Sequence, residues 1–397
     1  MESFVYEADS FQVTAEMKEQ FERDGYVIIR SVLSDEELRR LKEALEHDDG
    51  IMKHSYVVGD DKGRCNRMCL WNHPGDDITG MVGRCEKVAG TMEKLLDGEV
   101  YHYHTKLMMK EARTGGAFVW HQDYGYWYKN GCLFPHMGTV FIAIDQSDTE
   151  NGCLKVLKGS HAAGRIEHVM VGGQTGADLE RVEHLQKVLP LVDVELSPGD
   201  ALYFHCNLLH RSDANHSDRR RWAFLIAYNR ASNNPVEVHH HPQYTPLIKV
   251  PDKAILNCVE KGLSGKDFMN PADDKTSMAS PVANIPMQDL NVEEVNVTSA
   301  VLVGAAHHYG NFCRKQNDAF MDCRTEGKDP RKCLNEGKEV TQCALEFFKK
   351  VKGSCNESFT EYWSCLDYNN QNFEECRKKQ KVFDSCMAEK LGLKRAS

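Results

Sequence analysis

Apolar and polar residues follow two different patterns in the N-terminal part of the chain. Residues 14–50 predict a helix, a short strand "YVII" and a second helix, which begins with a capping box of Ser34 and Glu37. From residue 99 onward, short apolar runs follow one another, separated by turn residues such as "TENG", "GSH" and "SPGD". These runs are "VYHYHTKLMM", "FVWHQDY", "TVFIAI", "CLKVL", "LVDVEL", "ALYFH" and "RWAFLIAYN". Many short strands in series indicate an antiparallel sandwich or barrel.

The C-terminal part shows a third pattern, in which cysteines recur in pairs that each enclose nine residues. On a helix, ten steps make nearly three turns and about 15 Å of rise, so the two cysteines of a pair share a face but cannot bond each other. Two such helices laid antiparallel would be joined at both ends. The expected disulfides are Cys313–Cys343, Cys323–Cys333, Cys355–Cys386 and Cys365–Cys376. A zinc site would need more closely spaced cysteines, so we do not expect a metal here.

Composition places the chain among soluble globular proteins. Hydrophobic residues make up 41% of 397 residues, and no apolar run approaches the roughly 18 residues that a transmembrane helix needs. The first residues, "MESFVYEADSF", contain no early Arg, so neither a secretory signal nor a normal mitochondrial transit peptide is predicted. The net charge of −10 makes nucleic acid an unexpected partner.

Charge and cysteine usage change at the same place in the chain. Residues before 292 have a net charge of −11 and contain seven cysteines without regular spacing. Residues 292–397 have a net charge of +1 and contain eight paired cysteines. Between them, "NPADDKTSMASPVANIPMQD" is rich in Pro, Ser, Asn and Asp, as linkers are. We therefore predict a first domain at 1–270, a linker at 271–287 and a second domain at 288–397.

The run "AFVWHQDYGYWYKNG" contains the candidate chemistry of the first domain. On a strand, His121 and Asp123 would share a face and could both point into a barrel mouth. The same His-x-Asp spacing occurs twice elsewhere. His47/Asp49 lies at the polar end of a predicted helix and His216/Asp218 in a predicted loop, so neither is expected to be functional.

A catalytic metal needs a third ligand, and His205, His210 and His216 are available downstream. Two histidines and one carboxylate with open positions describe a non-haem Fe(II) oxygenase site. A zinc hydrolase could use similar ligands, but it would also need a general base and usually takes three His, or His with Glu.

The motifs "DGYVIIRSVLS", "WHQD", "ENGCLKVLKGSH", "SPGDALYFH" and "LLHRSDANHSDRRRWAF" resemble the phytanoyl-CoA dioxygenase family over residues 12–245. The resemblance implies a double-stranded β-helix (jelly-roll) with flanking helices, and a hydroxylase that uses Fe(II), 2-oxoglutarate and O2, with ascorbate as a further candidate. It also implies that His121, Asp123 and His210 are the catalytic metal ligands. Arg221 and Ser212 would hold the 2-oxoglutarate carboxylate. The sequence departs from the family at Arg211 and Asp213, where Gly is common.

Several neighbouring polar residues have alternative interpretations. A guanidinium can fork onto a carboxylate, which suits Arg221, whereas Arg219 and Arg220 are expected to be a solvated charge run. His205 is expected to be a barrel-lining or core histidine. Lys106 is a weaker candidate for the 2-oxoglutarate site, and a snorkelling surface lysine is the alternative.

The aromatic residues after the His-x-Asp motif point to a substrate wall. Tyr124, Tyr126 and Trp127 could be barrel packing, but they directly follow the ligands, where a substrate would approach. The run "WHQDYGYW" resembles branches of the family that hydroxylate small zwitterions such as ectoine and proline more than it resembles the acyl-CoA branch. Aromatic residues suit a compact cationic or amphiphilic small molecule, and the negative charge of the module disfavours CoA.

The second domain resembles the twin Cys-x9-Cys (CHCH-type) proteins of the mitochondrial intermembrane space. More closely, residues 288–393 resemble an accessory subunit of respiratory complex I, the alpha subcomplex subunit 8 family. The resemblance implies an all-α, disulfide-stapled pair of helical hairpins with a structural role, complex I subunits as partners, and a location at the mitochondrial inner membrane on the intermembrane-space side. The Pro-rich tail that is usual in that subunit is missing here.

The two resemblances disagree about compartment, because one module needs reduced Fe(II) and the other oxidising conditions. One hypothesis is a hydroxylase joined to a complex I scaffold subunit. The alternative is that only the scaffold role is real and two genes were joined in one reading frame. In that case the second protein would start at Met278 or Met287, and the oxygenase, expressed separately, would be cytoplasmic.

Overall fold

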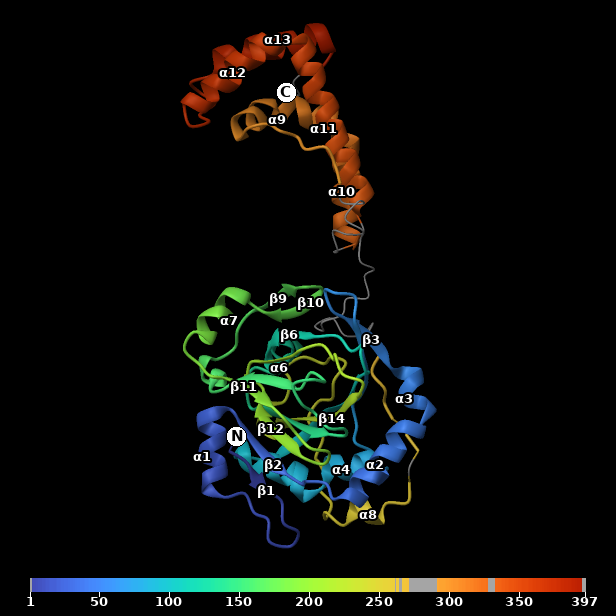
Figure 1. Cartoon of the computed structure of the whole chain (residues 1–397). Coiled ribbons are helices and arrows are strands. Elements are labelled where there is room, and N and C mark those ends of the chain that lie inside the picture. Colours follow the sequence, from blue (N-terminus) through green and yellow to red (C-terminus); the bar gives the residue numbers. More distant parts are fainter. Residues whose placement is uncertain (1, 261, 264–265, 271–290, 328–332, 395–397) are drawn as a thin grey trace. The chain divides into compact units, whose positions relative to one another are not determined.

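The computed structural model describes residues 2–260, 262–263, 266–270, 291–327 and 333–394. The chain divides into two compact units, Met1–Val282 and Ala283–Ser397 (Figure 1). The predicted linker, residues 271–287, lies outside the described residues.

Unit 1 is built on two sheets and a small hairpin. The eight-stranded sheet has the order β1 (Phe4–Val5), β2 (Tyr26–Arg30), β12 (Ala201–His205), β7 (Met137–Ala143), β14 (Arg221–Arg230), β5 (Val100–Lys110), β4 (Cys65–Trp71) and β3 (Tyr56–Gly59). The four-stranded sheet has the order β11 (Leu191–Val194), β8 (Leu154–Leu157), β13 (His210–Ser212) and β6 (Phe118–His121). Strands β9 (His168–Val171) and β10 (Gln174–Ala177) form the hairpin. All pairs are antiparallel except β1 with β2, which confirms the predicted antiparallel sandwich.

Unit 1 also contains eight α-helices among its described residues, and some of them begin at a side-chain cap. The helices of unit 1 are α1 (Ala15–Asp24), α2 (Asp35–His47), α3 (Asp49–His54), α4 (Ile78–Arg84), α5 (Thr91–Leu95), α6 (Asp123–Trp127), α7 (Leu179–Gln186) and α8 (Ala254–Asn257). Thr14 caps α1, and Ser34 and Glu37 form the predicted capping box at the start of α2.

Two apolar cores lie on the two faces of the large sheet. One contains residues of α1, α2, α4 and α5 packed against strand residues such as Val27, Phe224 and Ile226. The other joins residues of both sheets, including Phe118, Phe141, Val156 and Leu225. The second core therefore fills the space between the sheets, and it also forms the apolar wall of the cavity described below.

One predicted strand is shorter than expected, and this matters for the site. The run "FVWHQDY" was expected to be strand throughout, so that His121 and Asp123 would share a face. In the structure β6 ends at His121, Gln122 has extended backbone angles (φ −117°, ψ 136°), and Asp123 is the first residue of the short helix α6. The prediction that Asp123 lies on the strand is therefore wrong.

Unit 2 consists of five helices in its described residues: α9 (Ser299–Phe312), α10 (Arg314–Gly327), α11 (Leu334–Ser354), α12 (Asn356–Tyr368) and α13 (Arg377–Leu391). The structure contains the disulfides Cys313–Cys343, Cys323–Cys333, Cys355–Cys386 and Cys365–Cys376, the four pairs that the helix spacing predicts. They staple α10 to α11 and α12 to α13, which confirms two helical hairpins. Helix α9 was not predicted, and its Ala305 is buried in the core together with Phe347, Phe359 and Phe383.

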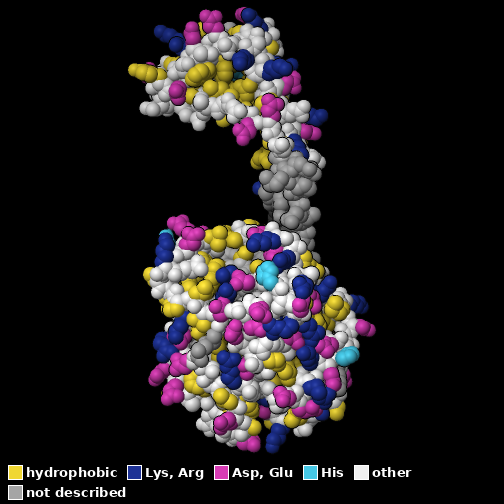
Figure 2. Space-filling model, viewed as in Figure 1, with side chains coloured by type: hydrophobic (Ala, Val, Ile, Leu, Met, Phe, Trp, Pro, Cys, Tyr) yellow, Lys and Arg dark blue, Asp and Glu magenta, His cyan; other side chains and the backbone are white. Residues whose placement is uncertain are grey.

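Surface charge is mixed over unit 1. Figure 2 shows acidic and basic side chains interspersed on the visible face of this unit. Among the described helices, none combines the length and the apolar character needed to cross a membrane.

Candidate metal centre

Three buried side chains come together at the ends of β6 and β13. His121 is the last residue of β6, His210 is the first residue of β13, and the two lie directly opposite each other in the strand pairing. Asp123 reaches the same place from the start of α6. One potential ligand atom from each residue lies within 4.8 Å of the others. Of the three histidines considered as third ligand, the structure thus places His210 beside the His-x-Asp motif.

Backbone and side-chain partners leave the inner atoms of this group free to bind a metal. The Nδ1 atoms of His121 and His210 lie 2.8 and 2.9 Å from the carbonyl oxygens of Val119 and Leu208, so each ring keeps its Nε2 available. Thr139 donates a hydrogen bond of 2.7 Å to one oxygen of Asp123. The other carboxylate oxygen lies 3.9 Å from Nε2 of His210.

Gln122, between the two motif residues, fixes the turn from β6 into α6. Its side chain is fully buried, and its amide nitrogen donates to the carbonyl oxygens of Gly164 (2.8 Å) and Asn207 (2.7 Å). Its side-chain oxygen accepts from the backbone nitrogen of Ile166 at 2.7 Å, and its own backbone nitrogen donates to His168 at 2.9 Å. Every polar group of this side chain is used, which locks the directions of His121 and Asp123.

Burial keeps the candidate histidine ligands neutral. It lowers the pKa of His121 well below the ordinary value, and the neighbouring His210 adds to the effect. Burial also lowers the pKa of His210, although Asp123 opposes this shift. A metal binds the neutral imidazole, so the site is in the correct protonation state at neutral pH.

The three side chains open into a cavity of about 100 Å³ between the sheets. Its wall is apolar on one side, with Met68, Leu70, Met108, Phe118, Phe141, Leu154 and Leu225. Polar and aromatic residues line the remainder: Tyr56, His104, Lys106, Tyr126, Trp127, Asn130, Arg211, Ser212, Arg221 and His241. The candidate metal ligands, Ser212, Arg221, Lys106, Tyr126 and Trp127 therefore share one cavity.

Arg221 places a buried guanidinium at one end of the cavity. Its side chain is 2% exposed, and its Nε atom has no hydrogen-bond partner among the described residues. It faces Phe141, and burial lowers the pKa of its guanidinium to about 10. Burying a charged guanidinium without a carboxylate partner costs free energy, unless a bound ligand supplies the carboxylate. The carboxylate of 2-oxoglutarate fits this requirement.

Ser212 lines the same end of the cavity, and Lys110 lies behind it. Lys110 is fully buried, pairs with Arg221 across β5 and β14, and donates to the Ser212 hydroxyl at 2.9 Å and to the carbonyl oxygen of Asp213. Burial, reinforced by the charge of Arg221, holds the pKa of Lys110 well below its ordinary value. Arg211 and Asp213 stand where the family commonly has Gly. The two side chains form an ion pair of 2.6 Å beside the cavity, so each residue has a partner there.

Two of the other candidates have different environments from those expected. Lys106 faces the cavity rather than the solvent, and burial lowers its pKa while the charge of Asp123 opposes the shift. The expectation of a snorkelling surface lysine does not describe it. Tyr124 does not line the cavity: it packs in a separate aromatic core with Tyr101 and Cys206, so the structure does not bring it to the substrate side.

Three histidines that were weighed in the sequence, His47, His205 and His216, lie away from the cavity. His205 packs against Phe21 and His161, and His47 is exposed at the end of α2. His216 lies 3.1 Å from the Arg64 guanidinium, and Asp218 is ion-paired with Arg113.

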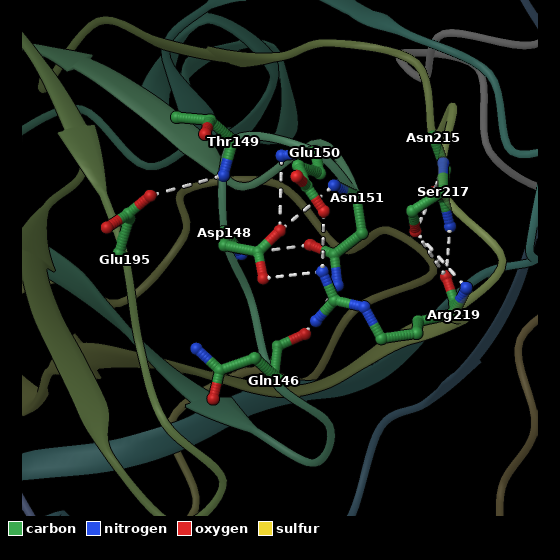
Figure 3. Close-up of polar contacts among 9 residues, drawn as sticks. All are labelled: Gln146, Asp148, Thr149, Glu150, Asn151, Glu195, Asn215, Ser217 and Arg219. Carbon is green, nitrogen blue, oxygen red and sulfur yellow. Dashed lines mark hydrogen bonds and ion pairs between the residues drawn. The ribbon is translucent and has the colours of Figure 1, made fainter.

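Arg219 and Arg220 are ion-paired rather than simply solvated. Arg219 contacts Asp148 at 2.9 Å and Glu150 at 3.2 Å within a polar network of two loops (Figure 3). Arg220 contacts Asp145 at 3.0 Å and also pairs with Glu46. These contacts direct both side chains away from the cavity and leave Arg221 as the member of the triplet that enters it.

Four residues of this region were not predicted from the sequence: Gln122, Thr139, Lys110 and His104. The run "HTKLMMK" carries a signal for two of them, because His104, Lys106, Met108 and Lys110 alternate and so share one strand face. No sequence pattern distinguishes Thr139 from other strand threonines. Its partner Asp123 is 16 residues away, and only the fold brings the two together.

Comparison with known proteins gives two separate likenesses. The family model phytanoyl-CoA dioxygenase (PhyH) matches residues 21–223, and a CHCH domain model matches residues 355–389. L-proline trans-4-hydroxylase of Streptomyces griseoviridis is 30% identical over 249 residues, which cover 58% of this chain and 90% of that enzyme. The NADH-ubiquinone oxidoreductase 20.8 kDa subunit of Neurospora crassa is 42% identical over 106 residues, which cover 26% of this chain and 58% of that subunit.

A solved structure shares the fold of unit 1. The crystal structure of EctD from S. alaskensis with 2-oxoglutarate and 5-hydroxyectoine superimposes with a TM-score of 0.51 and 21% identity, covering 62% of this chain and 91% of that one. The likeness confirms the double-stranded β-helix that was expected from the sequence.

Proposed function

Since residues 21–223 make this chain a member of the phytanoyl-CoA dioxygenase (PhyH) family, we propose that unit 1 is an Fe(II)- and 2-oxoglutarate-dependent hydroxylase of a compact zwitterionic molecule. The observation that carries the proposal is the cluster of His121, Asp123 and His210 in a cavity that also contains the unpaired guanidinium of Arg221. Two histidines and one carboxylate leave positions open for a cosubstrate and O2.

Each residue has a defined task in this proposal. His121, Asp123 and His210 would hold Fe(II), whose chemistry when bound is the activation of O2 with oxidation of 2-oxoglutarate to succinate and CO2. Arg221 would bind the distal carboxylate of 2-oxoglutarate by a forked hydrogen bond, and the Ser212 hydroxyl, which accepts from Lys110, would donate to the same carboxylate. Lys106 lines the cavity wall between the end that contains Arg221 and the opposite end. Its positive charge favours the binding of carboxylates.

The size and lining of the cavity support a small substrate. The space is about 100 Å³ and is bordered by Tyr126 and Trp127, which suit the apolar or cationic part of a compact molecule. The 30% identity to L-proline trans-4-hydroxylase, over 90% of that enzyme, favours an amino or imino acid over an acyl-CoA. Ectoine dioxygenase of Halomonas elongata, 29% identical over 270 residues, points in the same direction.

The test is conversion of 2-oxoglutarate to succinate by the full-length protein with Fe(II). We expect turnover to be lost in His121→Ala, Asp123→Ala and His210→Ala, and retained in His205→Ala, which lies outside the cavity. Full turnover by His210→Ala together with an inactive His205→Ala would show that the ligand set is wrong.

We further propose that unit 2 is a structural accessory module of respiratory complex I at the inner mitochondrial membrane, facing the intermembrane space. The supporting observations are the CHCH match, the four disulfides and the 42% identity to the 20.8 kDa subunit. Because the chain spans only 58% of that subunit, its association with the complex is part of the proposal.

An antibody to unit 2 tests both this role and the fusion. We expect a band near 45.1 kDa in denaturing gels and comigration with complex I in native gels of mitochondrial membranes. A much smaller band would instead support two separate gene products, and a band found only in the cytosolic fraction would contradict the scaffold role.

A further inference from the structure

His104 lines the cavity, and its ring nitrogens lack a hydrogen-bond partner among the described residues. The residue lies on β5, its exposure is 6%, and no hydrogen bond joins either ring nitrogen to another described residue. Nδ1 is completely enclosed. A buried polar group without a hydrogen bond costs free energy, so such a group in a cavity wall indicates a missing ligand.

The other histidines of the cavity differ in this respect. His121 and His210 each use Nδ1 on a backbone carbonyl, and Nδ1 of His241 lies 3.2 Å from the side-chain oxygen of Asn72. His102, two residues before His104 but outside the cavity lining, has both nitrogens occupied, by the Asn72 carbonyl oxygen at 2.9 Å and the Thr105 hydroxyl at 2.7 Å. The neighbouring imidazoles therefore have hydrogen-bond partners within the fold, whereas the ring nitrogens of His104 have none among the described residues.

The strand register separates His104 from the proposed cosubstrate site. Lys110 pairs with Arg221, whereas His104, six residues earlier on β5, pairs with Ala227. Six strand residues span about 20 Å. His104 instead lies level with Thr139, because Ala227 pairs with both residues, and the Thr139 hydroxyl binds the candidate ligand Asp123. The open nitrogens of His104 therefore belong to the other end of the cavity.

That end combines an aromatic wall with a positive charge. The His104 ring stacks on His241 at 4.8 Å and meets the edge of Trp127 at 5.7 Å. Lys106 is two residues further along the same strand face, and the only acidic residue that lines the cavity within the described chain is the candidate ligand Asp123. Burial, and next the charge of Lys106, hold the pKa of His104 well below its ordinary value, so the neutral ring offers one N–H donor.

We propose that His104 is a substrate-binding residue, whose ring N–H donates a hydrogen bond to the carboxylate of a compact amino or imino acid packed against Trp127. This inference rests on the proposed hydroxylase function and adds to it a specific anchor. The ligand group is a carboxylate because this end of the cavity is lined by hydrogen-bond donors and a positive charge. Among the described residues that line the cavity, the acidic one is the candidate metal ligand Asp123.

Binding of two probes, L-proline and ectoine, tests the proposal. Equilibrium dialysis would use the full-length protein without O2, in the presence of Fe(II) and 2-oxoglutarate. We expect wild-type protein to bind at least one probe, and His104→Phe, which keeps a planar ring but no nitrogen, to bind it roughly ten-fold or more weakly. His104→Gln, which retains an amide donor, should recover part of the loss, while the exposed control His136→Phe should match wild type.

The same variants separate this inference from the proposed function. Affinities for Fe(II) and for 2-oxoglutarate, measured by titration, should be unchanged in His104→Phe, and circular dichroism should show an intact fold. Wild-type protein that binds 2-oxoglutarate but neither probe would overturn the inference alone, as would a His104→Phe protein that binds the probe with wild-type affinity. Wild-type protein that fails to bind 2-oxoglutarate would overturn the proposed function first.

Discussion

Within the described parts of the chain, the side-chain hydrogen bond that orients the Asp123 carboxylate comes from the hydroxyl of Thr139 on β7, at 2.7 Å. Thr139→Val keeps the shape and removes this hydrogen bond, so the carboxylate loses its fixed direction. We expect Fe(II) affinity to fall by about ten-fold, the lower end of the range for residues that orient metal ligands. Anaerobic metal titration measures this. Thr175→Val is the matched control, because the Thr175 hydroxyl contacts only the Met170 sulfur; equal affinity of both variants would contradict the role of Thr139.

We expect the Arg221 guanidinium to bind 2-oxoglutarate through the geometry of its paired N–H groups as well as through its positive charge. Arg221→Lys retains the charge but loses the fork, and we expect 2-oxoglutarate binding to weaken by about 1–3 kcal/mol while Fe(II) binding persists. Calorimetric titration of 2-oxoglutarate under anaerobic conditions measures the change. Arg219→Lys is the comparison, since Arg219 makes only peripheral ion pairs. A 2-oxoglutarate affinity that is unchanged in Arg221→Lys would remove this residue from the site.

Candidate site residues could be predicted where they lie close together in a sequence motif. His121 and Asp123 are two residues apart, and the resemblance to the phytanoyl-CoA dioxygenase family pointed to Ser212 and Arg221 by their positions after His210. Gln122 and Lys110 could not be found in this way, because their partners come from other strands and loops. Tyr124 was misplaced for a related reason: the start of a helix at Asp123 turns it away from the cavity, toward Tyr101 and Cys206.

At the scale of elements, α2 depends on its capping box. The Glu37 backbone nitrogen donates to the Ser34 hydroxyl, and the Glu37 carboxylate accepts from the Ser34 backbone nitrogen at 2.8 Å. We expect Ser34→Ala to reduce the free energy of unfolding of unit 1 by about 1 kcal/mol. Urea denaturation followed by Trp fluorescence would detect this. Ser10→Ala, which removes an exposed contact to Glu7, should leave the midpoint unchanged.

Elements were predictable to the extent that their own residues determine them. The β runs, α2 and the helices that carry paired cysteines appear where the sequence predicts them, because alternation, capping and fixed spacing are local. Helix α6 replaced the end of a predicted strand because Gln122 is held by Gly164, Asn207 and Ile166, which are distant in sequence. Helix α9 lacks paired cysteines and so lay outside the pattern used to predict its neighbours.

For the whole molecule, the two units should respond differently to reduction. Each disulfide of unit 2 typically contributes about 2–4 kcal/mol, and a small helical module buries too little apolar surface to compensate for four lost links. We expect a thiol reductant to remove the far-ultraviolet circular dichroism of unit 2 and to leave 2-oxoglutarate binding by unit 1 intact. The seven cysteines of unit 1 form no disulfide in the structure. Loss of 2-oxoglutarate binding under the same conditions would contradict this independence.

The disulfides of unit 2 are nested, since Cys323–Cys333 lies inside Cys313–Cys343 and Cys365–Cys376 lies inside Cys355–Cys386. A single cut by a protease within either outer loop therefore releases no fragment, because at least one bridge still spans the break. Between Cys313 and Cys386, only the stretch from Cys343 to Cys355 lacks such a bridge. That stretch is the second half of α11, where Phe347 and Val351 are buried. A protease must unwind this half-helix before one cleavage can separate the two disulfide-linked hairpins from each other.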